Sequence, residues 1–111
     1  MSDEEAPLNN LGDMMLQMRE DSDRWFGAGT SENMTLMVLG ICGEAGEVAD
    51  LVKKVIRGSL TLEQAVPEIK EECIDVLHYL LMVMGMLGVD VIEEYKKKRA
   101  FNEARFGHGK N

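Results

Sequence analysis

Two pairs of acidic residues stand where the helical periodicity of the sequence would place apolar ones. Glu44 and Glu47 are three residues apart, and so are Glu72 and Asp75. In an α-helix, residues at this spacing point to the same side. The apolar positions in line with Glu44 are Met37, Val48, Leu51 and Val55, and those in line with Glu72 are Val76, Tyr79 and Val83. Both pairs therefore interrupt stripes that are predicted to face a core.

Converging carboxylates repel one another and need compensation. At about 4 Å and an effective dielectric of about 20, each like-charged contact costs about 4 kcal/mol. Mg²⁺ prefers carboxylate and water oxygens as ligands, and it often coordinates substrate phosphates at the same time. The alternative is a structural or solvated role, because most charged residues are exposed. We favour a metal site in which Mg²⁺, or Mn²⁺ in its place, is held by Glu44, Glu47, Glu72 and Asp75.

The elements that position these carboxylates are predicted to be helices, because apolar residues recur at three- and four-residue spacing and strand-like alternation is absent. Asn9 or Asn10 is expected to cap a first helix that ends near Trp25. Residues 26–33 (FGAGTSEN) are expected to form a Gly-rich loop. A second helix is then predicted over residues 34–57, before Gly58.

Two further helices are predicted after a short turn. Thr61 and Gln64 have the spacing of a capping box in that turn, and Pro67 suits the first turn of a third helix over residues 67–87. Asp90 and Glu93 form a second capping box, which opens a fourth helix over residues 90–106. Residues 1–8 are expected to be a flexible acidic tail and residues 107–111 a polar one, which leaves one helical domain over residues 9–106.

The third helix predicts self-association. Residues 74–87 are apolar nearly all round, interrupted mainly by His78, which we interpret as a core or interface histidine. Such a helix must be surrounded by other helices, and a chain of 111 residues supplies few. We therefore predict an all-α antiparallel bundle of about four helices, completed by a homodimer or homotetramer.

Composition narrows the class of protein. The net charge of −8 disfavours binding to a nucleic acid polymer, which Lys and Arg drive. No run of 18 apolar residues is present, so no membrane contact is expected, and the acidic N-terminus is unlike a signal peptide. We expect a cytoplasmic protein with Cys42 and Cys73 reduced and buried, although a disulfide between them is not excluded. Gly40, Gly43 and Gly46 indicate close helix approach.

The paired motifs resemble a known family. Residues 43–54 (GEAGEVADLVKK) and 71–81 (EECIDVLHYLL) are similar to the MazG-like nucleotide pyrophosphohydrolases, which carry ExxE on one helix and ExxD on a later antiparallel helix. The resemblance covers about residues 34–106. It implies an all-α dimer or dimer of dimers and Mg²⁺-dependent hydrolysis of nucleoside triphosphates, with deoxynucleotides favoured, to monophosphate and pyrophosphate. It implies a role in cleaning the nucleotide pool, and the four acidic residues match the family's metal ligands.

Several other residues are candidates for contact with a nucleotide. Lys54 shares the face of Glu47, with a solvated lysine as the alternative. The spacing of Lys98 and Asn102 resembles the family's last helix, where such residues hold phosphates. Arg105 lies at the edge of the same face. For Lys98, Asn102 and Arg105, the alternative role is to form salt bridges to the acidic helices.

Two aromatic residues complete the candidate substrate site. Tyr79 follows Asp75 by four residues, where the family has an aromatic residue near the sugar. Trp25 could stack on a base. Core packing is the alternative for both. Rival functions are a phosphoribosyl-ATP pyrophosphohydrolase, a hydrolase of modified nucleotides, or a non-catalytic helical module that binds a basic partner through its acidic patch.

Overall fold

The computed structural model describes residues 9–26 and 31–107. Over these residues it has four α-helices and no strand, which confirms the predicted all-α helical bundle. The helices are α1 (Leu11–Phe26), α2 (Ser31–Ile56), α3 (Leu62–Met86) and α4 (Val91–Asn102), and a π-helical turn, η1 (Glu103–Gly107), extends α4. The expected acidic tail over residues 1–8 lies outside the described residues. Of the expected polar tail only Gly107 is described, and it belongs to η1.

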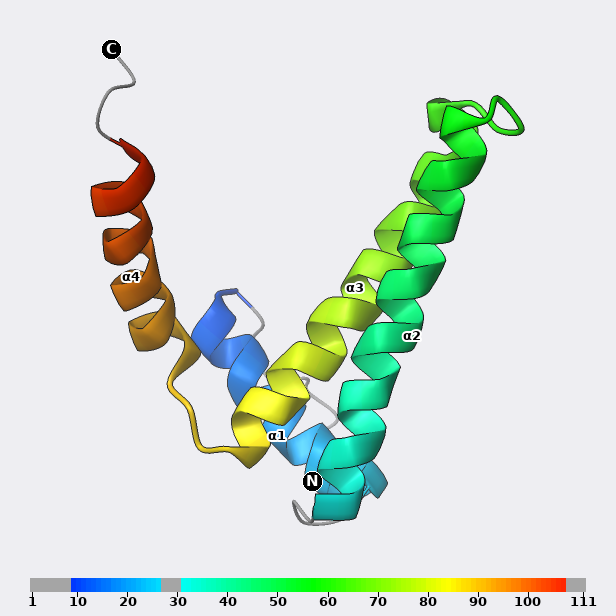
Figure 1. The fold of residues 1–111 in the computed structure, drawn as a ribbon. Coiled ribbons are helices and arrows are strands. Elements are labelled where there is room, and N and C mark those ends of the chain that lie inside the picture. The colour runs from blue at the N-terminus through cyan, green and yellow to red at the C-terminus, as the bar shows by residue number, and fades with distance from the viewer. Residues whose placement is uncertain (1–8, 27–30, 108–111) are drawn as a thin grey trace.

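The α2–α3 hairpin is the framework of the fold. Figure 1 shows these two long helices running antiparallel along most of their length. They make the most extensive helix–helix contact in the described part of the chain, and α1 packs against α3. Helix α4 stands apart from the hairpin and makes its extensive contacts only with η1. The site must therefore be sought on the hairpin and on the side that α1 covers.

Side-chain caps fix where the helices begin. Asn10 caps α1, since its Oδ1 accepts a hydrogen bond from the backbone N–H of Asp13 at 2.9 Å. Asp90 caps α4 in the same way, accepting from the N–H of Glu93 at 3.1 Å. Helix α2 begins at Ser31 rather than at residue 34, because the segment 31–33 holds neither Gly nor Pro and continues the helix backwards.

The start of α3 differs from the prediction. Thr61 Oγ1 accepts from the N–H of Gln64 at 3.1 Å, and Gln64 Oε1 accepts from the N–H of Thr61 at 2.9 Å. This capping box belongs to α3 itself and not to a separate turn, so the helix begins at Leu62. Pro67 consequently lies inside the helix rather than in its first turn, at the loss of one backbone hydrogen bond.

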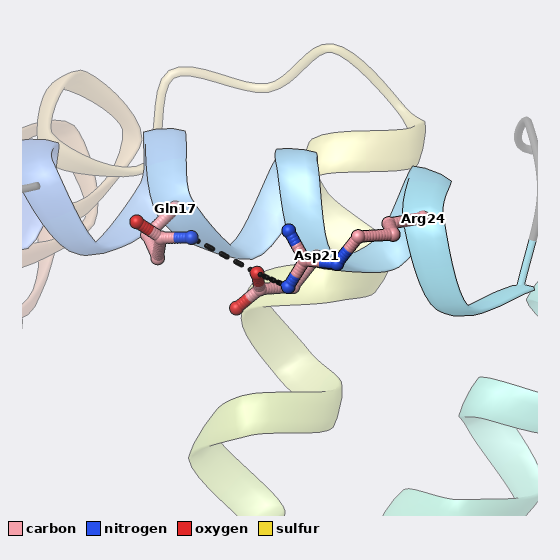
Figure 2. A network of polar contacts seen from close by, with 3 residues as sticks. All are labelled: Gln17, Asp21 and Arg24. Atoms are coloured by element: carbon pink, nitrogen blue, oxygen red, sulfur yellow. Dashed lines mark hydrogen bonds and ion pairs between the residues drawn. The ribbon is translucent and has the colours of Figure 1, made fainter. Parts of the chain in front are cut away.

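A polar network holds the side chain of Asp21, which is only 7% exposed, on α1 (Figure 2). Its Oδ1 accepts hydrogen bonds from Gln17 Nε2 at 2.9 Å and from Arg24 Nη2 at 2.7 Å. A carboxylate that has lost most of its hydration needs such partners. The network therefore compensates the burial of a charge on the helix that covers α3.

The apolar core of the described chain is small. The buried apolar residues are Met37, Leu51, Ala65, Leu81 and Met82. Cys42 and Cys73 are free and exposed, so the expected burial of both is wrong for the single chain. They lie on sides of α2 and α3 that do not face one another, and no other described helix covers them. The disulfide left open by the sequence is not formed.

No single helix in the described segments is long and apolar enough to cross a membrane. The pair Leu62–Met86 and Val91–Gly107 passes that test together by length and composition, with a bend of 107° at its break.

Candidate metal centre

Three of the four predicted ligands meet between α2 and α3. Glu44 on α2 and Glu72 and Asp75 on α3 each offer a carboxylate oxygen, and these oxygens lie within 4.8 Å of one another. Mg²⁺ binds oxygens at about 2.1 Å, so two ligands of one ion are at most about 4.2 Å apart. The oxygens would therefore have to move closer by some tenths of an ångström to bind one ion. Small rotations about side-chain torsions supply such a movement. The donor set, all carboxylate, is the kind that hard cations prefer.

Glu72 is the most perturbed member of this carboxylate cluster. Its Oε2 is buried, and no hydrogen-bond partner reaches it within the described residues. Only the protonated acid can donate a hydrogen bond to the neighbouring carboxylates of Glu44 and Glu47. This preference, together with desolvation and the like charges of both neighbours, raises the pKa of Glu72 from 4.5 to about 8. A buried oxygen without a donor, beside two other carboxylates, fits a site that takes a cation.

Glu47 lies at the edge of the cluster. It is exposed, and it is not one of the three residues whose oxygens converge within 4.8 Å. It is nevertheless close enough to Glu72 to raise the pKa of that group. The structure thus places all four predicted ligands in one neighbourhood, with Glu44, Glu72 and Asp75 at its centre and Glu47 beside them.

A pocket of about 250 Å³ opens next to the carboxylates. Its lining joins α1 to the hairpin and comprises Trp25, Glu44, Asp75, His78, Tyr79 and Met82. The ring of His78 is close to two other aromatic rings, with its centroid 5.7 Å from that of Trp25 and 6.4 Å from that of Tyr79. Tyr79 and Trp25, both predicted as substrate contacts, therefore border the same cavity as two of the acidic residues.

The position of Tyr79 depends on a glycine. A Cβ built on Gly40 would lie 2.8–2.9 Å from the ring of Tyr79, closer than any side chain tolerates. The predicted close approach is confirmed at Gly40. It is wrong for Gly43 and Gly46, where a Cβ would meet nothing within 4 Å in the described chain, because both point away from α3.

The predicted basic contacts lie elsewhere. Lys54 pairs with Asp50 on its own helix at 3.4 Å and does not line the pocket. Lys98 and Asn102 line a separate hollow of about 520 Å³ formed by α4 and η1 alone. The guanidinium of Arg105 lies over the ring of Phe106, 4.8 Å from its centroid. Within the described chain, then, the basic residues of α4 and the carboxylates are not brought together.

The pocket also contains residues that the sequence did not mark as a site. His78 was interpreted as a core or interface residue, yet it lines the cavity, and its buried Nε2 has no partner among the described residues. The available signal was its spacing, since a residue three after Asp75 shares that side of α3. Met82 extends the same row by one further turn.

Comparisons with known protein families, with curated proteins and with solved structures find no match to this chain. The features of the chain that indicate chemistry lie on the α2–α3 hairpin. They are three converging carboxylates, a fourth carboxylate beside them, and an aromatic pocket next to the cluster.

Proposed function

We propose that the protein is a Mg²⁺-dependent hydrolase that cleaves nucleoside triphosphates, with deoxynucleotides favoured, to the monophosphate and pyrophosphate. The observation that carries the proposal is the convergence of Glu44, Glu72 and Asp75 oxygens within 4.8 Å, with a buried Glu72 oxygen that has no hydrogen-bond partner among the described residues. The resemblance of residues 43–54 and 71–81 to the MazG-like pyrophosphohydrolases gives the reaction class. The net charge of −8 adds a reason for a cation, since a bare polyphosphate would be repelled.

Each carboxylate has a distinct place in this proposal. Glu44, Glu72 and Asp75 would hold the cation, and Glu72 must lose its proton to do so because its pKa is about 8. A divalent cation in such a site neutralises phosphate charge and makes water a better nucleophile. Glu47, exposed at the edge of the cluster, is the carboxylate best placed to accept a proton from that water.

The reaction is a single displacement at the α-phosphorus. Water forms the new P–O bond, the bond from the α-phosphorus to the bridging oxygen breaks, and pyrophosphate leaves with that oxygen. The proton released by the water passes to a carboxylate of the cluster. No covalent intermediate on the protein is needed.

The aromatic pocket gives the nucleoside a place beside the carboxylates. At about 250 Å³ it is smaller than the 300–1,000 Å³ typical of a whole drug-sized ligand, so it suits a base or a sugar rather than an entire nucleotide. Trp25 supplies an aromatic face for stacking and Tyr79 a ring near the sugar. The polyphosphate would then extend from the pocket along the carboxylates.

Product analysis tests the proposal. Wild-type protein with Mg²⁺ should convert at least one of the eight common nucleoside triphosphates to monophosphate and pyrophosphate, resolved by ion-exchange chromatography. Glu47→Gln and Asp75→Asn should each lower the rate at least about a hundredfold, equivalent to about 2.7 kcal/mol of transition-state stabilisation. Glu71→Gln is the matched control, because Glu71 is exposed on the same helix and outside the cluster. Release of diphosphate and inorganic phosphate would mean attack at the γ-phosphorus and a different enzyme class. Inactivity on every nucleotide with Mg²⁺ and with Mn²⁺ would favour a binding module.

A further inference from the structure

Two buried side-chain atoms in the described part of the chain have no hydrogen-bond partner, and both belong to the candidate site. They are Oε2 of Glu72, in the carboxylate cluster, and Nε2 of His78, whose ring lines the pocket beside that cluster. Buried polar atoms are paired in most folded proteins, so each exception requires an explanation. The proposed cation explains Glu72. It does not explain His78, because a hard cation prefers oxygen and His78 is not among the residues that converge.

A purely structural role does not account for His78 either. A histidine that only fills a core gives its ring nitrogens to backbone or side-chain partners, and Nε2 of His78 has none among the described residues. The two neighbouring rings do not stack flat on the imidazole, since Trp25 is inclined to it by 49° and Tyr79 by 37°. The nitrogen is therefore available to a molecule that enters the pocket.

The other polar side chains of the pocket have places of their own. In the proposed function the carboxylates of Glu44 and Asp75 hold the cation. The hydroxyl-bearing end of Tyr79 packs against α2, where a Cβ on Gly40 would lie 2.8 Å from its Cζ. A ligand pocket needs a few well-placed polar groups to select what it binds. The buried polar atom left for that purpose is Nε2 of His78.

We propose that His78 recognises the nucleobase of the substrate through a hydrogen bond at Nε2 and thereby sets the base preference of the enzyme. The inference rests on the proposed function and adds the residue that selects the substrate. Trp25 is 51% exposed, so part of its ring remains open for stacking. A base on that ring would bring its edge to the imidazole, whose centroid is 5.7 Å away. Rotation about the soft χ2 torsion of His78 turns Nε2 toward that edge.

An imidazole can pair with either kind of group on a base edge. With its proton on Nε2 it donates to a carbonyl oxygen or a ring nitrogen, and with the proton on Nδ1 it accepts from an exocyclic amino group. A site built to form such a bond discriminates against a base that lacks the matching group, because the protein atom then stays buried without a partner. His78 needs no contact with the phosphates for this, so its effect is on the choice of substrate and not on bond cleavage.

Steady-state kinetics on substrates with and without a base test the proposal. The set comprises the four common deoxynucleoside triphosphates and 2′-deoxyribose 5′-triphosphate, which carries no base. Wild-type protein should prefer one base by about tenfold in kcat/KM, the size of one neutral hydrogen bond. His78→Phe should lose that preference, mainly through KM, and should cleave the baseless substrate as wild type does. His78→Gln, whose amide also forms hydrogen bonds, should keep part of the preference.

A matched control separates the hydrogen bond from the shape of the pocket. Met82 lines the same pocket, and Met82→Leu changes its packing without removing a strong polar group, so this variant should keep the wild-type order of bases. Far-UV circular dichroism verifies that each variant remains helical.

Binding measurements give an answer that does not depend on hydrolysis. Trp25 is the one tryptophan of the chain, so its fluorescence reports the entry of deoxynucleoside monophosphates into the pocket. One of the four should bind wild type about tenfold more tightly than the others, and His78→Phe should bind all four alike. If no triphosphate is cleaved but this difference is seen, the proposed function fails and the role of His78 stands. Equal affinity of wild type for all four bases overturns that role. So does a preference that survives in His78→Phe, or a loss in that variant that is as large on the baseless substrate.

Discussion

The pKa of Glu72 leads to a quantitative prediction about metal binding. With a pKa of about 8, the Glu72 carboxyl is about 1% ionised at pH 6 and about half ionised at pH 8. A carboxylate must be deprotonated to hold a cation, so the proton competes with the metal. If Glu72 is a ligand, the apparent affinity for Mg²⁺ should therefore rise about 50-fold between pH 6 and pH 8. Near pH 7 each binding event should release about one proton.

Isothermal titration calorimetry measures both quantities. Titrations of Mg²⁺ in buffers of different ionisation enthalpy give the affinity at each pH and the number of protons released. Glu72→Gln should weaken binding and lose the dependence on pH, because the amide neither titrates nor carries charge. Glu71→Gln should keep the wild-type dependence, because Glu71 lies outside the cluster. An affinity that is flat from pH 6 to pH 8, or a Glu72→Gln variant that behaves as wild type, would refute the assignment of Glu72 as a ligand.

The same raised pKa predicts how stability changes with pH in metal-free protein. Below about pH 4.5 Glu72 is protonated in both the folded and the unfolded chain and contributes no difference. Above that pH the unfolded chain ionises first, so the folded state binds more protons and its stability falls as pH rises toward 8. Thermal melts should show this decline in wild type, a smaller one in Glu72→Gln, and its reversal by Mg²⁺.

Two pairs of variants test the packing of the hairpin and the polar network of α1. Gly40→Ala should lower stability by about 1–3 kcal/mol, because its Cβ meets the ring of Tyr79, whereas Gly43→Ala should raise it by up to about 1 kcal/mol. Urea melts of the pair decide the matter, and equal effects would contradict the close approach. Asp21→Ala should cost about 1–3 kcal/mol through the loss of its two hydrogen bonds, and exposed Asp23→Ala should cost little. Equal unfolding free energies for Asp21→Ala and Asp23→Ala would mean that the Asp21 network does not stabilise α1.

The carboxylate cluster could be predicted from the sequence because local rules determine most of it. Spacing of three residues puts Glu72 and Asp75 on one side of a helix, and their alignment with apolar residues turns that side inward. Only one further condition is needed to bring Glu44 to them: α2 must pack antiparallel to α3 in a register that places Glu44 level with Glu72 and Asp75. The short connection between two long helices supplies it, since such helices pack as antiparallel neighbours. The pocket required more, because Trp25 reaches it from α1 through tertiary packing that no local pattern encodes.

Helix α4 shows where sequence reasoning fails. Its capping residue was predictable, whereas the α-helix ends at Asn102 rather than near residue 106 and continues as the π-helical turn η1. Its direction depends on residues 87–90 and on what it packs against. In the described chain it lies apart from the hairpin, so Lys98 and Asn102 do not approach the carboxylates. Periodicity identifies the face on which residues sit and says nothing of which partner that face meets. The role of these residues as phosphate contacts remains a prediction.

Helix α3 carries two of the clustered carboxylates and also an apolar side that no described helix covers. A segment that is apolar nearly all round needs neighbours on every side, and α3 has them on two: α2 against Val76, and α1 near Met82, which shares a pocket with Trp25. The remaining side holds Leu80 and Cys73, both exposed. The residues of α2 on the same side of the hairpin, among them Cys42 and Val52, are exposed as well. The self-association predicted from the sequence of α3 stays a prediction, and in the described chain the side of α3 left open for it is the one that holds Leu80 and Cys73.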